Sequence, residues 1–183
     1  VHADDITIKS FISRLPVIIF ENMSNLISVK NLRLVKPSNE PFVNLNNMFS
    51  GCVNLEDVNF VNAPDFGYCN NAFRATSIGK NTNGIVRLYE DLGIPASSIS
   101  GAQGTSMFGD NSYIKEFIFP DEEFGDFYSQ QLFNQCTNLK IIRNLKSSNL
   151  GIMFRFCRGA SNVELINCYI TVPFNSDGCE GIT

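Results

Sequence analysis

The sequence predicts an α/β solenoid: a right-handed superhelix of about six short helix–strand units with one face lined by strands. Three observations lead to this prediction. A phenylalanine preceded by an apolar residue recurs along the chain. An apolar pattern with helical spacing surrounds the clearest copies, and an alternating pattern typical of a strand follows it. Units this small cannot bury an apolar face alone, so they must stack on one another.

The stretch 44–60, NLNNMFSGCVNLEDVNF, shows the unit most clearly. The residues with helical spacing are Leu45, Met48, Phe49 and Cys52. They predict a short helix, and Leu-x-x-Val-x-Phe over 55–60 predicts a half-buried strand. Asparagine precedes the first strand residue in four copies, at Asn25, Asn54, Asn138 and Asn162. Because asparagine tolerates the left-handed conformation, we expect it to end each helix.

The same frame recurs around each anchor phenylalanine. The anchors are Phe20, Phe49, Phe73, Phe108, Phe133 and Phe154. The copy after Phe73 delays its strand to 85–88, behind the turn-rich insertion GKNTNG, and the copy after Phe154 has a three-residue insertion. We expect the six rings to share one apolar interior, with Met23 at a core position of the first copy.

The repeats indicate a single domain over residues 1–183. Residues 1–16 form a predicted N-terminal cap segment, where Ile6 and Ile8 alternate as in a strand. The repeats cover 17–172, with an insertion near 79–106 whose turn residues predict a protruding loop, and 173–183 form a tail. Because a solenoid end needs a cap and the tail offers no capping helix, we expect the domain to be part of a longer chain.

The frame MF-x-x-C-x-x-L-x-x-V-x-F, best preserved at 48–60 and 132–142, resembles the BspA-like leucine-rich repeats and the related bacterial surface repeats rich in MF-x-x-C. The resemblance covers roughly residues 17–172. It implies a leucine-rich-repeat solenoid in a surface-exposed or secreted protein, used for adhesion and binding, with no enzyme activity. The anchors are spaced less evenly than the family pattern.

The composition excludes several classes of function. A net charge of −4, spread along the chain, argues against a nucleic acid as partner. No apolar run approaches the ~20 residues that a membrane-spanning helix needs. The six cysteines form no CxxC pair, and we expect them to be buried and reduced, with a disulfide or a metal site as the alternative. No cofactor and no metal site is predicted.

The sequence predicts no enzyme. The one histidine, His2, lies near the terminus, so a Ser–His or Cys–His pair has no evident base. The densest acidic set is Asp121, Glu122, Glu123 and Asp126. We interpret it as a solvated acidic turn, with calcium binding and catalysis as alternatives. The segment SGAQGTSMF, at 100–108, lacks the lysine of a phosphate-binding loop and is interpreted as a flexible loop before a helix.

The strand-lined face is the predicted binding surface. Its candidate residues are Ser28, Lys30, Asp57, Asn59, Glu116, Ile118, Ile141 and Arg143. They are mixed in charge and contain no aromatic stripe. We therefore expect a binding or adhesion module, extracellular or on the cell surface, that recognises a protein or glycan on a host or neighbouring surface. The alternative is a structural component of a virion or phage tail, with self-assembly or contacts to flanking domains.

Overall fold

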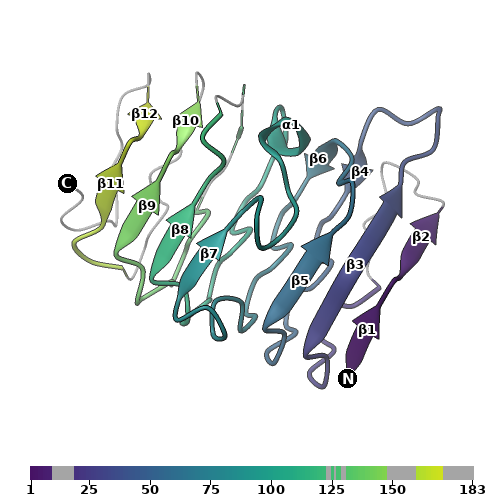
Figure 1. Cartoon of the computed structure of the whole chain (residues 1–183), viewed down its shortest axis with the longest axis horizontal. Helices are drawn as coiled ribbons and strands as arrows, with labels where there is room; N and C mark the ends of the chain where they lie inside the picture. Colours follow the sequence, from purple (N-terminus) through teal and green to yellow (C-terminus); the bar gives the residue numbers. More distant parts are fainter. Residues whose placement is uncertain (10–18, 123–124, 126, 129–130, 148–159, 171–183) are drawn as a thin grey trace.

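Strands from successive repeats lie side by side and run in the same direction, so the chain forms a parallel β-solenoid of about five turns (Figure 1). The computed structural model describes residues 1–9, 19–122, 125, 127–128, 131–147 and 160–170. The prediction of a solenoid is confirmed. The prediction of helix–strand units is wrong, because the described chain contains almost no helix.

Two parallel sheets form the main strand-lined face. The first contains β1 (His2–Asp4), β3 (Ser28–Val35), β2 (Thr7–Lys9) and β5 (Asp57–Phe60). The second has the order β11 (Glu164–Ile166), β9 (Ile141–Arg143), β8 (Glu116–Ile118) and β7 (Ile85–Arg87). In the register of the second sheet, Val86 pairs with Phe117, and Phe117 with Ile142. This fixed register places equivalent side chains of successive coils in rows.

Shorter elements continue the coils beyond the main strands (Figure 1). Strand β4 (Val43–Asn44) pairs with β6 (Phe66–Tyr68), and β10 (Lys146–Ser147) pairs with β12 (Tyr169–Ile170), again in parallel. The helix α1 (Ala96–Ile99) is a single turn that packs near β6. In the part of the chain that the structure describes, no helix is long and apolar enough to cross a membrane.

The anchor phenylalanines form a continuous column inside the solenoid. Phe20, Phe49, Phe73, Phe108 and Phe133 stack in chain order with centroid separations of 5.2, 5.5, 5.2 and 5.9 Å. All five rings are buried. The predicted shared interior is confirmed for these five, and Phe154 lies outside the described residues.

The predicted helices are replaced by a ribbon of consecutive turns, in which left-handed residues recur every fourth position. The residues two before and two after the later anchors all have positive φ: Asn47 and Gly51, Asn71 and Ala75, Ser106 and Asp110, Gln131 and Gln135. A residue with positive φ in the third place of a β-turn is the mark of a type II turn and is incompatible with a continuing helix.

This ribbon divides its hydrogen bonds between two directions. The amides of Met48, Ser50 and Cys52 bond to the carbonyls three residues earlier in the same coil. The alternate amides, those of Asn47, Phe49 and Gly51, bond to carbonyls of the next coil at 2.9 to 3.0 Å. An α-helix would use all of these amides internally, so it could not join the coils.

The helical spacing of apolar residues arises because two type II turns bury the same positions as two helical turns. Leu45, Met48, Phe49 and Cys52 are all fully buried, as predicted, although the backbone is not helical. Asparagine, glycine and glutamine between them decide the outcome, because repeated left-handed residues are tolerated in turns and not in helices.

The asparagines predicted to end helices have a different role in three of four copies. Asn162 is left-handed, with φ 56°, but Asn25, Asn54 and Asn138 are not among the positive-φ residues. Instead, the Asn54 side chain donates to the carbonyl of Ser24 at 2.8 Å, and Asn138 donates to that of Ser112 at 2.7 Å. These amides join neighbouring coils.

The residues three positions after the anchors form a buried row that also links the coils. Cys52 donates its thiol to the carbonyl of Phe20, and Cys136 donates to that of Phe108 at 3.0 Å. In the coil before that of Cys136, Asn111 occupies the same position, and its side-chain amide donates to the carbonyl of Phe73 at 2.8 Å. The prediction that Met23 is buried in this row is wrong: Met23 is 42% exposed, in the first described coil of the row.

The insertion near 79–106 is packed against the solenoid and does not protrude as predicted. It contains strand β7, at the delayed position that the sequence predicts, and α1. Leu88, Leu92 and Ile94 are buried in the connection between them. The turn residues were interpreted as a loop tip, but the apolar residues between them cover the core.

Candidate functional site

The predicted binding residues on the strand face divide into two groups. Ser28, Lys30, Asp57 and Asn59 lie on β3 and β5, and Glu116, Ile118, Ile141 and Arg143 lie on β8 and β9. Ser28 contradicts the prediction of an exposed contact residue: it is 4% exposed, and its hydroxyl lies 2.8 Å from Nδ1 of His2. The strand β1 pairs with this part of β3 and places His2 directly beside the serine.

The charged members of this face are paired with one another. Lys30 lies 3.0 Å from Asp57, which raises the pKa of Lys30, and Arg143 Nε lies 2.5 Å from Glu116 Oε1. The Asn59 amide donates to the carbonyl of Asp91 at 3.4 Å. These contacts join neighbouring coils, and the predicted binding role of this face stays a prediction.

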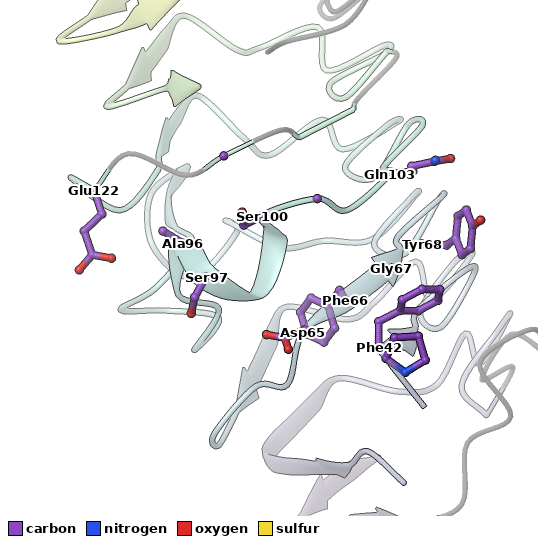
Figure 2. Close-up of a pocket in the computed structure, with 13 residues that line it drawn as sticks. Phe42, Asp65, Phe66, Gly67, Tyr68, Ala96, Ser97, Ser100, Gln103 and Glu122 are labelled. Atoms are coloured by element: carbon purple, nitrogen blue, oxygen red, sulfur yellow. The ribbon is translucent and has the colours of Figure 1, made fainter. Parts of the chain in front are cut away.

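A concave feature lies elsewhere, where α1 stands beside β6. A cleft of about 650 Å³ opens there, and we call it the aromatic cleft (Figure 2). Its lining includes Phe42, Tyr68, Asp65, Ser97, Ser100 and Gln103, together with Glu122. Figure 2 shows Phe42, Tyr68 and Gln103 following one another along one side, with the two serines of the α1 region at the centre.

The wall formed by α1 is held in place by buried contacts. Ala96, Ser98 and Ile99 are buried, and the Ser98 hydroxyl donates to the carbonyl of Ala63 at 2.9 Å. Pro95 is the N-cap residue of α1, and its extended backbone (φ −72°, ψ 162°) marks where the helix begins. Ser97 and Ser100, three positions apart, are exposed and present hydroxyls to the cleft.

The aromatic side of the cleft is built from two adjacent coils. The rings of Phe42 and Tyr68 meet edge to face, with centroids 5.7 Å apart. Gly67 lies directly beneath Phe42, and a Cβ there would come within 2.1 Å of the Phe42 ring. The glycine therefore lets the ring lie flat against the backbone of β6.

One row of side chains continues from the cleft along the solenoid axis. Tyr68 pairs in parallel with Gln103, and Gln103 pairs with Tyr128; we call these three residues the tyrosine ladder. The backbone amide of Gln103 donates to the carbonyl of Gly67 at 2.9 Å, and the backbone amide of Tyr128 donates to the carbonyl of Ala102 at 2.9 Å. The tyrosines are 36% and 41% exposed. Backbone pairing thus presents two aromatic rings and one amide on three successive coils.

The charged side chains of the cleft are both acidic. Asp65 and Glu122 line it, and among the described residues no lysine, arginine or histidine does so. Such a lining disfavours phosphate, sulfate and carboxylate ligands.

Of the predicted acidic turn, Asp121 is engaged elsewhere. The Lys146 ammonium lies 2.5 Å from its carboxylate, and the Asn167 amide lies 3.1 Å away. These bonds lower the pKa of Asp121. Glu122 lines the cleft, while Glu123 and Asp126 lie outside the described residues. Within the described chain, no group of three or more histidine, cysteine, aspartate or glutamate residues has a metal-binding arrangement.

The described cysteines are free thiols, as predicted, and do not line the cleft. Cys52, Cys69 and Cys136 are buried, and Cys168 is half-buried. Burial raises the pKa of Cys136 to about 12 and raises that of Cys69 further. Both thiols therefore stay protonated at neutral pH and behave as small apolar groups.

The sequence prediction did not include the tyrosine ladder, because the repeat frame begins at each anchor and the ladder residues precede it. Each ladder residue stands five positions before its anchor: Tyr68 before Phe73, Gln103 before Phe108, and Tyr128 before Phe133. Extending the repeat alignment in the N-terminal direction would have placed them in one row. The contribution of α1 had no comparable signal.

Parallel coils, an interior phenylalanine column and a surface cleft rich in aromatic and hydroxyl groups define a class of protein: a parallel β-solenoid with a candidate ligand-binding site. Comparison with protein-family models, curated proteins and solved structures finds no match to this chain.

Proposed function

We propose that this chain is a non-catalytic binding module of a surface-exposed or secreted protein, and that its aromatic cleft holds a neutral or cationic glycan. The single observation that carries the proposal is the composition of the cleft. Surface rings at Phe42 and Tyr68 stand beside hydroxyl, amide and carboxylate groups, with no basic side chain among the described lining residues.

A glycan suits this mixture better than an apolar ligand does. Sugar rings have one apolar face that packs on aromatic side chains and a rim of hydroxyls that needs both donors and acceptors. Tyr68 and Phe42 supply the apolar contact, Ser97 and Gln103 can donate and accept, and Asp65 accepts. Small-molecule sites generally combine an apolar wall with a few placed polar groups in this way.

The surface location rests on the repeat frame. The resemblance to BspA-like surface repeats supports an extracellular or cell-surface setting and a role in adhesion. The cross-coil bonding of the strand face supports a rigid scaffold that presents the cleft, because each coil is fixed to its neighbours by backbone and side-chain hydrogen bonds.

The proposal is tested by binding to an array of neutral and amino-containing oligosaccharides, with tyrosine fluorescence as a solution readout. The protein has five tyrosines and no tryptophan, so a ligand that covers Tyr68 alters a large share of the emission. The double variant F42A/Y68A is expected to lose binding by at least about tenfold. Tyr113→Ala, at a tyrosine that is 41% exposed and does not line the cleft, is the matched control.

Binding that survives F42A/Y68A unchanged, or no binding to any glycan on the array, contradicts the proposal. Incubation with a bound glycan tests the non-catalytic part: the glycan is expected to keep its length. Shortening that disappears in an Asp65→Asn variant would reassign the cleft as an active site.

A further inference from the structure

The tyrosine ladder extends beyond the aromatic cleft. Tyr68 and Gln103 line the cleft, but Tyr128, one coil further, does not. The parallel bridges that join the three residues place them on one row that runs along the solenoid axis, across the strands. Figure 2 shows Tyr68 and Gln103, the first two residues of this row, with the ring of Phe42 beside Tyr68.

The spacing of this row follows from sheet geometry. Adjacent strands lie about 4.8 Å apart, so the backbones of Tyr68 and Tyr128, two coils apart, are separated by about 10 Å. This is close to the length of two linked pyranose rings. Gln103 stands midway, where its amide can donate to and accept from the hydroxyls of a sugar between the two rings.

We propose that the ligand is a linear oligosaccharide that lies parallel to the solenoid axis, with one sugar against Phe42 and Tyr68 and another against Tyr128. This inference rests on the proposed function and adds to it the shape, the direction and the minimum length of the ligand. The chain must be at least three sugars long to reach both tyrosines, and it carries no acidic groups.

The alternative direction, along a coil, offers no comparable row. Within β6, the residue before the exposed Tyr68 is Gly67, and Phe66 is buried. A ligand that followed the strand would therefore meet one ring only. Across the coils, exposed rings recur at Tyr68 and Tyr128, with relative exposures of 36% and 41%.

The test measures affinity against chain length, with cello-oligosaccharides and chito-oligosaccharides of two to six sugars as the probes. Affinity is expected to rise at least about tenfold between two and four sugars and then to level off. Tyr128→Ala is expected to remove this rise and to leave the affinity for the disaccharide unchanged. Tyr68→Ala is expected to weaken every length, and Tyr128→Phe, which keeps the ring, to behave like the wild type.

The possible outcomes distinguish failure of the axial-ligand proposal from failure of the proposed glycan-binding function. Affinity that is independent of length, or a Tyr128→Ala variant with the wild-type length dependence, overturns the axial ligand and leaves the cleft as a site for one or two sugars. Failure of both series to bind also overturns the axial ligand, whereas the function of the cleft is decided separately by the oligosaccharide array. Thermal unfolding at the wild-type temperature shows that a variant is folded, and a Tyr128→Ala variant that unfolds early is replaced by Tyr128→Ser in the same comparison.

Discussion

The rings of Phe73 and Phe108 lie nearly parallel, with 6° between their planes and 5.2 Å between their centroids. At this separation the rings are offset, which aromatic pairs prefer to direct superposition. Because every coil contributes one such ring, the relationship repeats from Phe20 to Phe133 and forms the spine of the solenoid.

We predict that Phe73→Ala destabilises the protein by about 3–5 kcal/mol, because it leaves a cavity between two rings in a fully buried position. Urea denaturation followed by circular dichroism measures the free energy of unfolding. Tyr89→Ala, at a residue that is 55% exposed, is the control and is expected to change it by no more than about 0.5 kcal/mol. Equal effects of the two substitutions would contradict the central role of the column.

Alanine substitutions at two glycines with similar φ distinguish the cost of a strained backbone from the cost of crowding between coils. Gly101 has φ +77° and open space where a side chain would stand, so Gly101→Ala is expected to cost about 1–2 kcal/mol for the left-handed backbone alone. Gly93 has φ +70°, and a Cβ added there would lie 2.1 Å from the carbonyl oxygen of Phe60.

Gly93→Ala is therefore expected to cost more than Gly101→Ala by about 1–3 kcal/mol, the usual penalty of overpacking. Thermal and urea unfolding of the two variants give the comparison. If the two costs are the same, the close approach of residues 93 and 60 does not constrain the coils.

The buried amide of Asn111 joins two neighbouring coils, and its substitution gives a graded test. Its Oδ1 accepts from Thr76 Oγ1 at 2.7 Å, and its Nδ2 donates to the carbonyls of Phe73 and Phe108, both at 2.8 Å. Asn111→Ala removes these bonds and also the one that the Thr76 backbone amide donates to Oδ1 at 3.1 Å. The loss of this buried network is expected to cost at least about 1–3 kcal/mol, the penalty for one buried group left unbonded.

Asn111→Cys is expected to recover part of that loss. The thiols of Cys52 and Cys136 occupy the same place in their coils and donate to the carbonyl of the preceding anchor. A cysteine at position 111 can do the same toward Phe73. A free energy of unfolding for Asn111→Cys that is no higher than that for Asn111→Ala would show that the row does not act as a set of equivalent links.

The free energy of unfolding is expected to decrease at acid pH, because Glu56 becomes protonated. Hydrogen bonds from Lys80 and Asn81 lower the pKa of Glu56 below its ordinary value of 4.5. Because the folded pKa is the lower one, the pair stabilises the fold above pH 4.5, and this contribution disappears as the pH falls through the folded pKa.

The variant Glu56→Gln tests this dependence. It is expected to be less stable than the wild type at pH 7 and to approach it as the pH falls toward about 3. Urea denaturation across this range measures both proteins. A stability difference that stays constant with pH would mean that the Glu56 charge contributes nothing to the cross-coil contact.

The thiols are expected to react in an order set by burial. Because burial raises the pKa of Cys136 to about 12, the reactive thiolate is scarce at about pH 8, and the same holds for Cys69. A short alkylation pulse followed by peptide mapping is expected to label Cys168 before Cys52, Cys69 and Cys136. In denaturant all four are expected to react alike, and early labelling of Cys69 in the native protein would contradict the packing.

The repeat period and the buried positions were predicted correctly from the sequence, but the backbone conformation was not. Phe49 and Cys52 lie where their spacing placed them, and the strand over 55–60 appears as β5. The helices failed because type II turns and α-helices bury the same positions, and apolar spacing alone does not distinguish them. The left-handed residues, such as Asn47 and Gln135, carried the missing information.

The binding surface was predicted less well. Exposure on a strand face was inferred from alternation, which does not show that a residue of a neighbouring strand, such as His2 of β1, packs beside Ser28. The aromatic cleft combines residues far apart in the sequence, from Phe42 to Glu122, and its wall depends on how α1 packs. A repeat alignment finds rows of residues, but not the irregular insertion that turns a row into a cleft.

Because of the ribbon of turns, the two faces that a coil packs against its neighbours carry the same pattern of groups in successive coils. An anchor ring, a left-handed residue on either side and outward-facing amides recur in copies that begin at Phe108 and Phe133. Duplication of one such copy would therefore join without redesign at either junction. The array can therefore grow one copy at a time, and each added copy would contribute one further ring to the phenylalanine column.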